Sequence, residues 1–177
     1  MTSAVHVGKL YEAVISRRLT HLGCTLTSVG GAFDQCVDLG GTWCLPSTPP
    51  APWVGDAVRL QYTCTGALPP GPISLPVVVQ CKATRSPVGV STLRELVHAV
   101  ASRFPEDTLA ILCSTGGFAW RSLRREREWA LRDVLLLHTT QSGSLLQVLQ
   151  LRRMGARENL PISFSSLSLP QRARELA

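Results

Sequence analysis

Four polar residues in the first half of the chain have side chains suited to chemistry on phosphate esters. Glu12 and Asp38 carry carboxylates, and Gln80 and Lys82 stand two residues apart at the end of the apolar stretch PVVVQCK. Because residues two apart in a strand share a face, we expect Gln80 and Lys82 to point together while Cys81 turns away into packing. The four residues therefore predict one polar site near the end of this strand.

Phosphodiester hydrolysis is the reaction that these residue types suit best. It needs a cation to neutralise charge on the phosphate oxygens and a group that orients the attacking water. Asp38 is a hard oxygen ligand for Mg²⁺ or Mn²⁺, the Gln80 carbonyl oxygen is a weaker second ligand, and Glu12 completes the set or binds one of the metal's waters. Lys82 would orient the attacking water and stabilise the transition state.

The lysine at this position is unusual for this chain. The sequence has sixteen arginines and two lysines, and one of the two lysines follows a run of valines. An ammonium buried without a partner is costly, so the strand either surfaces at Lys82 or brings it to an anionic site. We favour the anionic site, because Gln80 shares the same face. A lysine whose charged end simply reaches solvent at the strand end is the alternative.

The composition is that of a folded, basic protein. The chain has 177 residues, 45% of them hydrophobic, which suits one compact domain with a substantial core. A net charge of +6 and a pI of about 9.4 indicate a polyanion as partner. Six cysteines show no CxxC or CxxH pairing, which favours reduced, mostly buried thiols over a zinc site or a disulfide scaffold. With no apolar run long enough to cross a membrane and no secretory signal, we expect a soluble intracellular protein.

Hydrophobic periodicity predicts an alternation of helices and strands. Ser3 can cap a first helix, whose apolar face would consist of Tyr11, Ile15, Leu19 and Leu22. The predicted elements, in chain order, are a helix over 3–22, a strand from 24 into a glycine turn, two short extended pieces around Gly40 and Gly41 that form a hairpin, a peripheral strand over 57–64, a buried strand over 73–82, a helix over 91–103, a buried strand over 108–113, a helix over 118–132 and a last core strand over 134–140.

These elements predict an α/β fold with one central mixed sheet flanked by helices. Residues 1–143 would form the core, in the order helix, three strands, helix, strand, followed by one extra helix and one extra strand. A proline-rich insertion occupies residues 45–74, which hold seven of the twelve prolines. Residues 144–177 begin with helical spacing and then lose any pattern, so we expect a peripheral C-terminal extension.

The motifs resemble those of a known nuclease superfamily. The segments GKLYE, GGAFDQCVDLGGTW, VVVQCK and STLRELVHAV are similar, in this order, to the Mrr-like branch of the PD-(D/E)xK superfamily, in which the last acid before the lysine is commonly a glutamine. The residues of these motifs look closest to those of the fungal mitochondrial required-for-respiratory-growth family, over roughly residues 8–138. The resemblance implies a restriction endonuclease-like core, an active-site trio of Asp38, Gln80 and Lys82, and Glu12 as the helix-borne acid.

The same resemblance implies DNA as the partner and mitochondria as the location. The candidate contacts to nucleic acid are Lys9, Arg94, Arg121 and Arg124. The arginines over 121–132 also alternate with glutamates, so pairing within a helix explains them at least as well as phosphate binding. A nuclease that cuts both strands of a duplex would often act as a homodimer.

Two positions depart from the family pattern. Cys36 stands where a glycine is usual, in the turn that aims Asp38. Further along, the segment GFAWRSL replaces a usual Gly-Phe-Thr pattern. Neither change removes a candidate catalytic group, but the first predicts an altered turn and the second predicts altered substrate contacts.

Other interpretations of the same residues stay open. Glu12 could be an ordinary helix-surface acid paired with Lys9, and Asp38 could cap a glycine turn. Gln80 could be the neutral remnant of a lost acid, which would leave a nucleic-acid-binding protein that keeps the nuclease fold but does not cut. A third class of function is an interaction scaffold that uses the proline-rich insertion.

Overall fold

The computed structural model describes residues 3–29, 36–45, 53–54, 58–64, 73–119, 132–151 and 162–168. The elements, in chain order, are α1 (Ala4–His21), β1 (Cys24–Ser28), β2 (Leu39–Leu45), β3 (Trp53–Val54), β4 (Val58–Cys64), β5 (Ile73–Lys82), α2 (Val90–Arg103), β6 (Leu109–Ser114), β7 (Val134–Thr139), β8 (Leu145–Leu151) and β9 (Ile162–Ser168). No helix within the described ranges is long and apolar enough to cross a membrane.

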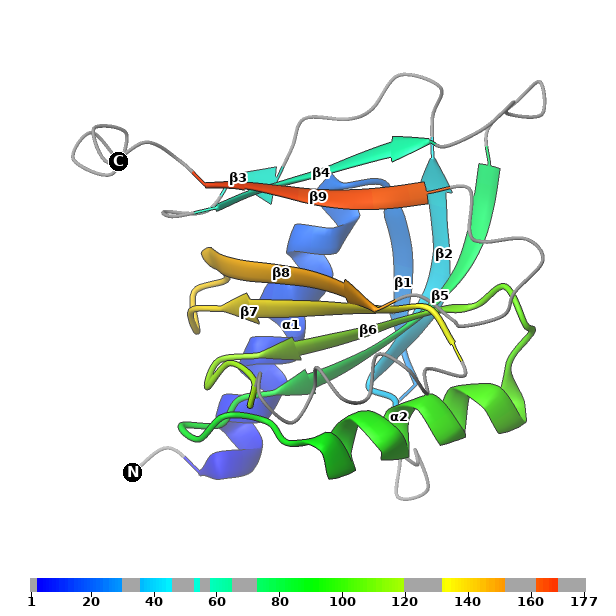
Figure 1. Ribbon diagram of the computed structural model, residues 1–177. Coiled ribbons are helices and arrows are strands. Elements are labelled where there is room, and N and C mark those ends of the chain that lie inside the picture. The colour runs from blue at the N-terminus through cyan, green and yellow to red at the C-terminus, as the bar shows by residue number, and fades with distance from the viewer. Residues whose placement is uncertain are drawn as a thin grey trace.

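A six-stranded mixed sheet forms the centre of the molecule (Figure 1). Its strand order is β1-β2-β5-β6-β7-β8, in which β5, β6 and β7 are parallel and the other neighbours are antiparallel. Parallel neighbours need a crossover connection, and α2 supplies it between β5 and β6. The carboxyl ends of the three parallel strands therefore lie at one edge of the sheet, where Lys82, Ser114 and His138 are in register.

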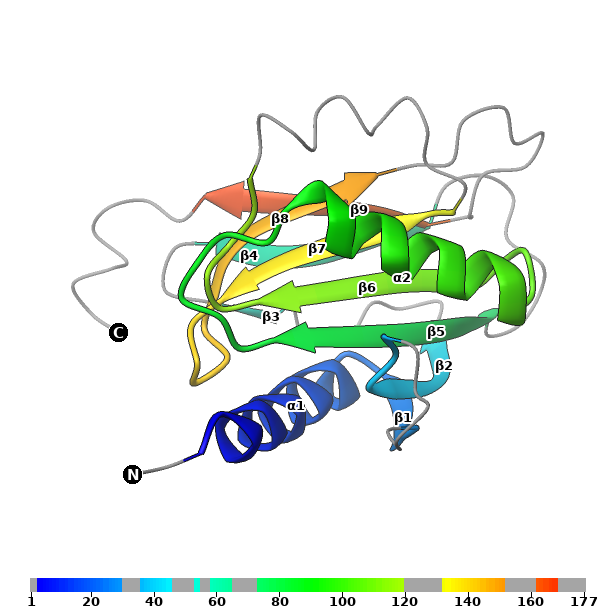
Figure 2. The same ribbon diagram turned by 90° about the horizontal axis from the view of Figure 1, so that it is seen from below.

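Helices α1 and α2 cover opposite faces of this sheet (Figure 2). Val77 and Val79 of β5 pack in the cluster that contains α1, whereas Val78 packs in the cluster that contains α2. The valine run is buried on both faces for this reason, as predicted for a central strand. The buried face of α2 consists of the four predicted residues, Leu93, Leu96, Val97 and Val100.

Helix α1 begins where its sequence predicts. Ser3 is the N-cap, and its Oγ accepts a hydrogen bond from the His6 N–H at 3.2 Å. Gly23 follows the end of the helix with a φ of +96°, a left-handed conformation that glycine adopts readily. The fully buried Tyr11 pairs its hydroxyl with Thr139 Oγ1 at 2.7 Å, which ties the helix to β7. Burial raises the pKa of Tyr11 far above its usual value, so the phenol stays neutral.

The proline-rich insertion contributes to the core. Its strands β3 and β4 form a three-stranded antiparallel sheet with β9, from near the end of the chain (Figure 1). Trp53, Val58 and Leu60 are buried in the same cluster as α1, and Trp53 Nε1–H donates to the Gly143 carbonyl at 3.2 Å. The predicted strand over 57–64 is therefore present, but it belongs to a second sheet that packs against the first.

Two predicted elements are wrong and one lies mostly outside the described residues. Strand β2 runs without a break through the two glycines that predict separate extended pieces, although β1 and β2 do form a hairpin. Residues 145–151, whose spacing predicts a helix, form the edge strand β8, because Val148 packs on one face of the sheet and Leu149 on the other. The helix predicted over 118–132 is described only at its ends, and Phe118 is extended, bridging to Val88.

The exposed surface of α2 agrees with the prediction from its periodicity. Arg94, Glu95 and His98 are all exposed on the outer side of the helix.

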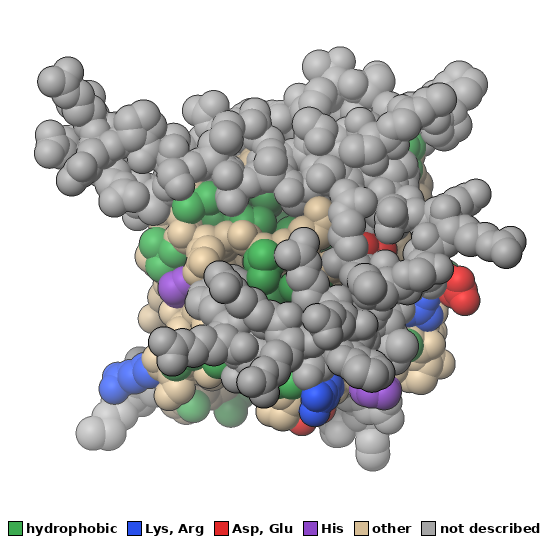
Figure 3. All heavy atoms as spheres, viewed as in Figure 1, with side chains coloured by type: hydrophobic (Ala, Val, Ile, Leu, Met, Phe, Trp, Pro, Cys, Tyr) green, Lys and Arg blue, Asp and Glu red, His purple; other side chains and the backbone are tan. Residues whose placement is uncertain are grey.

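On the face shown in Figure 3, the basic side chains of the described residues are separated from one another rather than gathered in one patch. The described part of this face therefore has no extended basic surface of the kind that binds nucleic acid along its length.

The glycine pair in β2 reflects a close approach of two strands. Gly41 lies opposite Leu26 in the β1–β2 ladder, and a Cβ at this position would collide with the backbone carbonyl of Thr25. A backbone carbonyl inside a ladder cannot rotate away without breaking the pairing. Glycine is therefore needed within the strand, and the pattern that usually marks a turn here marks tight packing.

Replacing Gly41 by alanine should lower the free energy of unfolding, because the new methyl group forces β1 and β2 apart. The expected loss is about 1–3 kcal/mol, the usual range for an overpacked site. Urea unfolding followed by circular dichroism measures the change. The control is Gly8→Ala in α1, where no atom lies within 4 Å of an added Cβ; it should leave stability unchanged or raise it by up to about 1 kcal/mol. Similar values for the two variants would contradict the close approach.

Candidate active site

Asp38 lies where the pairing of β2 with β5 ends. The last registered pair is Leu39 with Val79, and the Asp38 N–H donates to the Val79 carbonyl at 2.9 Å. Its carboxylate Oδ2 accepts the Cys81 N–H at 2.6 Å, so a side chain replaces the strand partner that this N–H would otherwise need. One position beyond the last pair, Asp38 faces the position of Gln80 across the two strands.

Gln80 is buried with its amide unsatisfied. The residue is 1% exposed, and neither Oε1 nor Nε2 has a hydrogen-bond partner in the described part of the chain. A buried polar group without a partner costs about 1–3 kcal/mol, so each one in a native structure calls for an explanation. Cys81 packs on the α1 face of the sheet, and strand alternation therefore places Gln80 and Lys82 together on the opposite face, as predicted.

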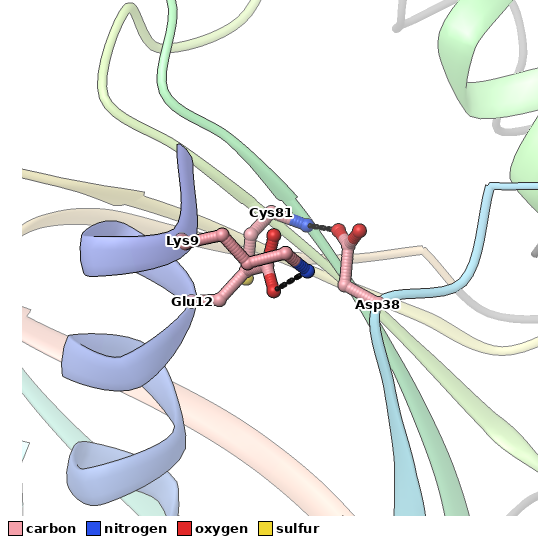
Figure 4. Close-up of polar contacts among 4 residues, drawn as sticks. All are labelled: Lys9, Glu12, Asp38 and Cys81. Atoms are coloured by element: carbon pink, nitrogen blue, oxygen red, sulfur yellow. Dashed lines mark hydrogen bonds and ion pairs between the residues drawn. The ribbon is translucent and has the colours of Figure 1, made fainter. Parts of the chain in front are cut away.

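Glu12 projects from α1 toward the same end of β5 (Figure 4). Its carboxylate forms an ion pair with Lys9 at 2.7 Å, and its side chain is 14% exposed whereas that of Lys9 is 58% exposed. Figure 4 shows both side chains reaching toward Cys81 and Asp38. Glu12 is therefore the partner of Lys9, and its charge, like that of Asp38, acts on Cys81.

The thiol of Cys81 lies within reach of both carboxylates. A hydrogen bond with Cys113 does most to raise the pKa of Cys81, burial raises it further, and the negative charges of Asp38 and Glu12 add to the effect. The thiol is therefore protonated at neutral pH and serves as a packing group rather than a nucleophile. The described cysteines are all free thiols: Cys24, Cys36, Cys44, Cys81 and Cys113. Only Cys24 and Cys113 are buried, so the prediction of mostly buried thiols is wrong for this set.

The donor set is small for a metal site. Within the described ranges, no three His, Cys, Asp or Glu side chains are grouped so as to hold a metal ion. The available donors are the Asp38 carboxylate and the Gln80 amide oxygen across from it, whereas Glu12 extends from α1, which covers the other face of the sheet. Because Mg²⁺ commonly binds one or two carboxylates and completes its shell with water and substrate phosphates, the set fits this ion. The unpartnered amide oxygen of Gln80 is an atom that such an ion would satisfy.

Two of the four candidate contacts to nucleic acid lie within the described residues. Lys9 is ion-paired with Glu12, and Arg94 is exposed on α2. Arg121 and Arg124 fall outside the described residues. The structure therefore brings Lys9 to the candidate active site, whereas Arg94 lies on the outer surface of the helix.

Cys36 adopts a backbone conformation that suits the glycine usual at this position. Its φ is 76°, in the left-handed region, where a side chain costs roughly 1–2 kcal/mol. The next residue, Val37, is buried under α2. This packing fixes the position of the backbone just before Asp38. The departure from the family pattern thus keeps the shape of a glycine turn and adds strain, whereas the sequence alone predicts an altered turn.

Sequence comparison identifies the family of this chain. Residues 3–125 match the family described as Required for respiratory growth protein 7, a span that includes all four candidate catalytic residues. The chain belongs to this family. A curated relative, the mitochondrial Required for respiratory growth protein 7 of Candida glabrata, is 31% identical over 140 residues. The match covers 63% of the chain and 54% of the relative, so the chain spans about half the length of this relative. No solved structure matches the chain significantly.

Replacing Gln80 by methionine should raise the free energy of unfolding by about 1–3 kcal/mol in metal-free buffer, because a buried amide without a partner is removed at similar side-chain length. Urea unfolding measures the change. The matched control is Gln147→Met at an exposed position of β8, which should change stability by less than about 0.5 kcal/mol. A clear loss of stability in Gln80→Met would mean that the amide is satisfied in solution, which contradicts the assignment.

Replacing Cys36 by glycine should raise the free energy of unfolding relative to Cys36→Ala by about 0.5–1 kcal/mol, because only glycine relieves the left-handed conformation. The alanine variant removes the same thiol but keeps the Cβ, so it separates backbone strain from any effect of the sulfur. Thermal unfolding of the two variants side by side measures the difference. An alanine variant at least as stable as the glycine variant would show that the turn carries no strain.

Proposed function

We propose that this protein is a metal-dependent nuclease that hydrolyses phosphodiester bonds in DNA. The observation that carries the proposal is the position of Asp38 opposite a buried Gln80 whose amide lacks a partner in the described part of the chain. An amide oxygen of this kind, beside a carboxylate, suits a site that is completed by a divalent cation and by substrate. Lys82 follows on the same face of the strand.

The chain order of the elements supports a restriction endonuclease-like core. With the insertion that holds β3 and β4 set aside, α1, β1, β2, β5, α2 and β6 follow the order helix, three strands, helix, strand. The candidate residues lie on α1, just before β2 and at the end of β5. The PD-(D/E)xK resemblance implies acids and a lysine at these places, and the family match covers all of them.

Each residue has a distinct part in the proposed reaction. Asp38 and Gln80 would hold Mg²⁺ or Mn²⁺, and Glu12 would complete the set or bind one of the metal's waters past the end of β5. The ion would neutralise charge at the phosphate oxygens. The Lys82 ammonium orients the attacking water and stabilises the charge that develops on phosphorus oxygens, and no ion pair ties it to another described residue.

In the absence of metal and substrate, Lys9 balances the negative charge of Glu12. The ion pair joins a 58% exposed lysine to a nearly buried acid, and exposed ion pairs of this kind contribute about 0–1 kcal/mol. The ammonium can therefore leave the carboxylate at little cost. In this proposal it holds Glu12 in place and yields it when a cation or a substrate phosphate arrives.

The location is proposed from the curated relative. That relative is named as mitochondrial and as required for respiratory growth. We propose the same compartment for this protein, with the mitochondrial genome as the DNA on which it acts. Because the chain spans about half of the relative, the proposal concerns the activity of the matched core.

A second candidate function is binding of nucleic acid without cleavage. It is favoured by the neutral Gln80 at a position where an acid would bind a metal more strongly, and by the small donor set among the described residues. The net charge of +6 serves either function. A binder of this class would lose affinity steeply with salt but gain nothing from Mg²⁺.

Purified protein should cut labelled DNA in the presence of Mg²⁺ or Mn²⁺, tested on single-stranded, duplex and branched substrates. Lys82→Ala and Asp38→Asn should each lower the rate by about 100-fold or more, because each removes charge directed at the transition state. In Asp38→Asn the amide oxygen can still accept the Cys81 N–H, so the fold is retained.

His98→Ala, at an exposed position of α2, is the control and should cut at the wild-type rate. Binding measured by fluorescence anisotropy on the same substrates separates the two functions. Equal binding by all four proteins with no cutting under any metal would reject the nuclease and leave the binding module.

A further inference from the structure

A pocket of about 430 Å³ opens beside the candidate active site, between the end of β5 and the start of α2. Lys82 and Arg85 bring two positive charges to it, and Ser86 and Thr92 bring hydroxyl groups. The Thr84 hydroxyl also lines the pocket but donates to the Ser86 carbonyl at 2.9 Å. None of its described lining residues is acidic, and neither cation forms an ion pair with another described residue. A concave site with two unneutralised cations is suited to an anion.

The start of α2 adds to the positive potential of this pocket. Gly89 is the N-cap, no side chain caps the helix, and the first turn contains no acidic residue. The first N–H groups of a helix have no partner within it, and they carry the positive end of the helix dipole, about half a unit charge. These donors are added to the two cations already present.

The loop that forms the pocket wall is held in place by its neighbour. Thr115 Oγ1 donates to the Thr84 carbonyl at 2.8 Å, and the Val88 N–H donates to the Gly117 carbonyl at 2.9 Å. Gly116 approaches so closely that a Cβ there would collide with the backbone carbonyl of Ser86. The backbone of the pocket wall is thus fixed before any ligand arrives, which lowers the entropy cost of binding.

We infer that this pocket binds the terminal phosphate of a nucleic-acid strand. A phosphate monoester carries about −1.5 to −2 charges at neutral pH, which matches two cations and a helix start better than the single charge of a backbone diester. A volume of about 430 Å³ lies in the range of sites for small ligands, so a terminal nucleotide can enter with its phosphate. Because Lys82 belongs both to the pocket and to the proposed active site, the inference rests on the proposed function and restricts its substrate to strands that end in phosphate.

The test is binding of the full chain to one labelled oligonucleotide carrying a 5′-phosphate, a 3′-phosphate or only hydroxyl ends, in buffer with a metal chelator so that nothing is cut. One of the phosphorylated forms should bind at least about tenfold more tightly than the hydroxyl form, as expected for one or more charge-assisted hydrogen bonds. Arg85→Ala should abolish this preference and should lower the affinity for the hydroxyl form no more than loss of one charge elsewhere on the surface does. Equal affinity for all three ends would overturn the inference.

Arg103→Ala is the matched control, since it removes the same charge from an exposed position at the opposite end of α2 and should keep the preference. A nucleoside monophosphate serves as competitor: displacement of the phosphorylated strand only at concentrations far above the Kd of that strand supports strand ends as the ligand, whereas equal affinity would overturn that assignment. Because no metal is present, failure of the nuclease assay leaves this result intact. Cutting that shows no preference for phosphorylated ends would retain the nuclease and reject the pocket.

Discussion

The hydrogen bond from the Cys81 N–H to the Asp38 carboxylate is the contact on which the candidate site depends. Strands β2 and β5 pair up to Leu39 and Val79, and beyond that point a side chain takes over the role of a strand. One oxygen of the carboxylate accepts the N–H and the acid still has lone pairs to offer elsewhere. The main chain of β5 therefore fixes the acid beside Gln80, which the same strand carries. The relative position of acid and amide then depends on sheet register rather than on flexible side chains.

Two unfavourable features of the described structure lie beside this contact. Gln80 buries an amide without a described partner, and Cys36 holds a left-handed turn two residues before Asp38. Elsewhere in the core Tyr11 pairs with Thr139, whereas Thr108 Oγ1 and Arg132 Nε are also buried without a described hydrogen-bond partner. Strain and unmet hydrogen bonds persist in proteins mainly where function requires them. The two features beside Asp38 therefore support a site there without being specific to it, because Thr108 and Arg132 also bury unsatisfied atoms.

Local patterns were sufficient for some elements and not for others. The helices α1 and α2 have one apolar face each, so their period is clear in the sequence. Strands β5, β6 and β7 have no period because both faces are buried, but their short continuous apolar runs identify them. Strand β4 finds its partner β9 about a hundred residues later, and no local pattern reveals such a pairing. The glycines of β2 look like a turn because the carbonyl of Thr25, which explains them, belongs to another strand.

The same distinction applies to the site. The spacing of Lys9 and Glu12 already indicates their ion pair, because residues three apart on a helix are neighbours. The alternation of Gln80, Cys81 and Lys82 likewise follows from strand geometry. The bond between Asp38 and Cys81 could not be predicted, since it depends on the register of two strands separated by the whole insertion. Nor could the burial of Gln80, which depends on packing from both sides.

The chain's two lysines both lie on the elements that build the site. The other sixteen of its eighteen Lys and Arg residues are arginines. Lys9 nevertheless pairs with Glu12, and Lys82 ends β5. An ammonium is a compact point charge with freely rotating donors, whereas a guanidinium is a planar fork that holds a carboxylate in a fixed geometry. A site that must release Glu12 to another cation, and adapt to a phosphate whose geometry changes during reaction, is better served by lysine. Arg85, at the wall of the neighbouring pocket, has the fork suited to a phosphate that stays bound.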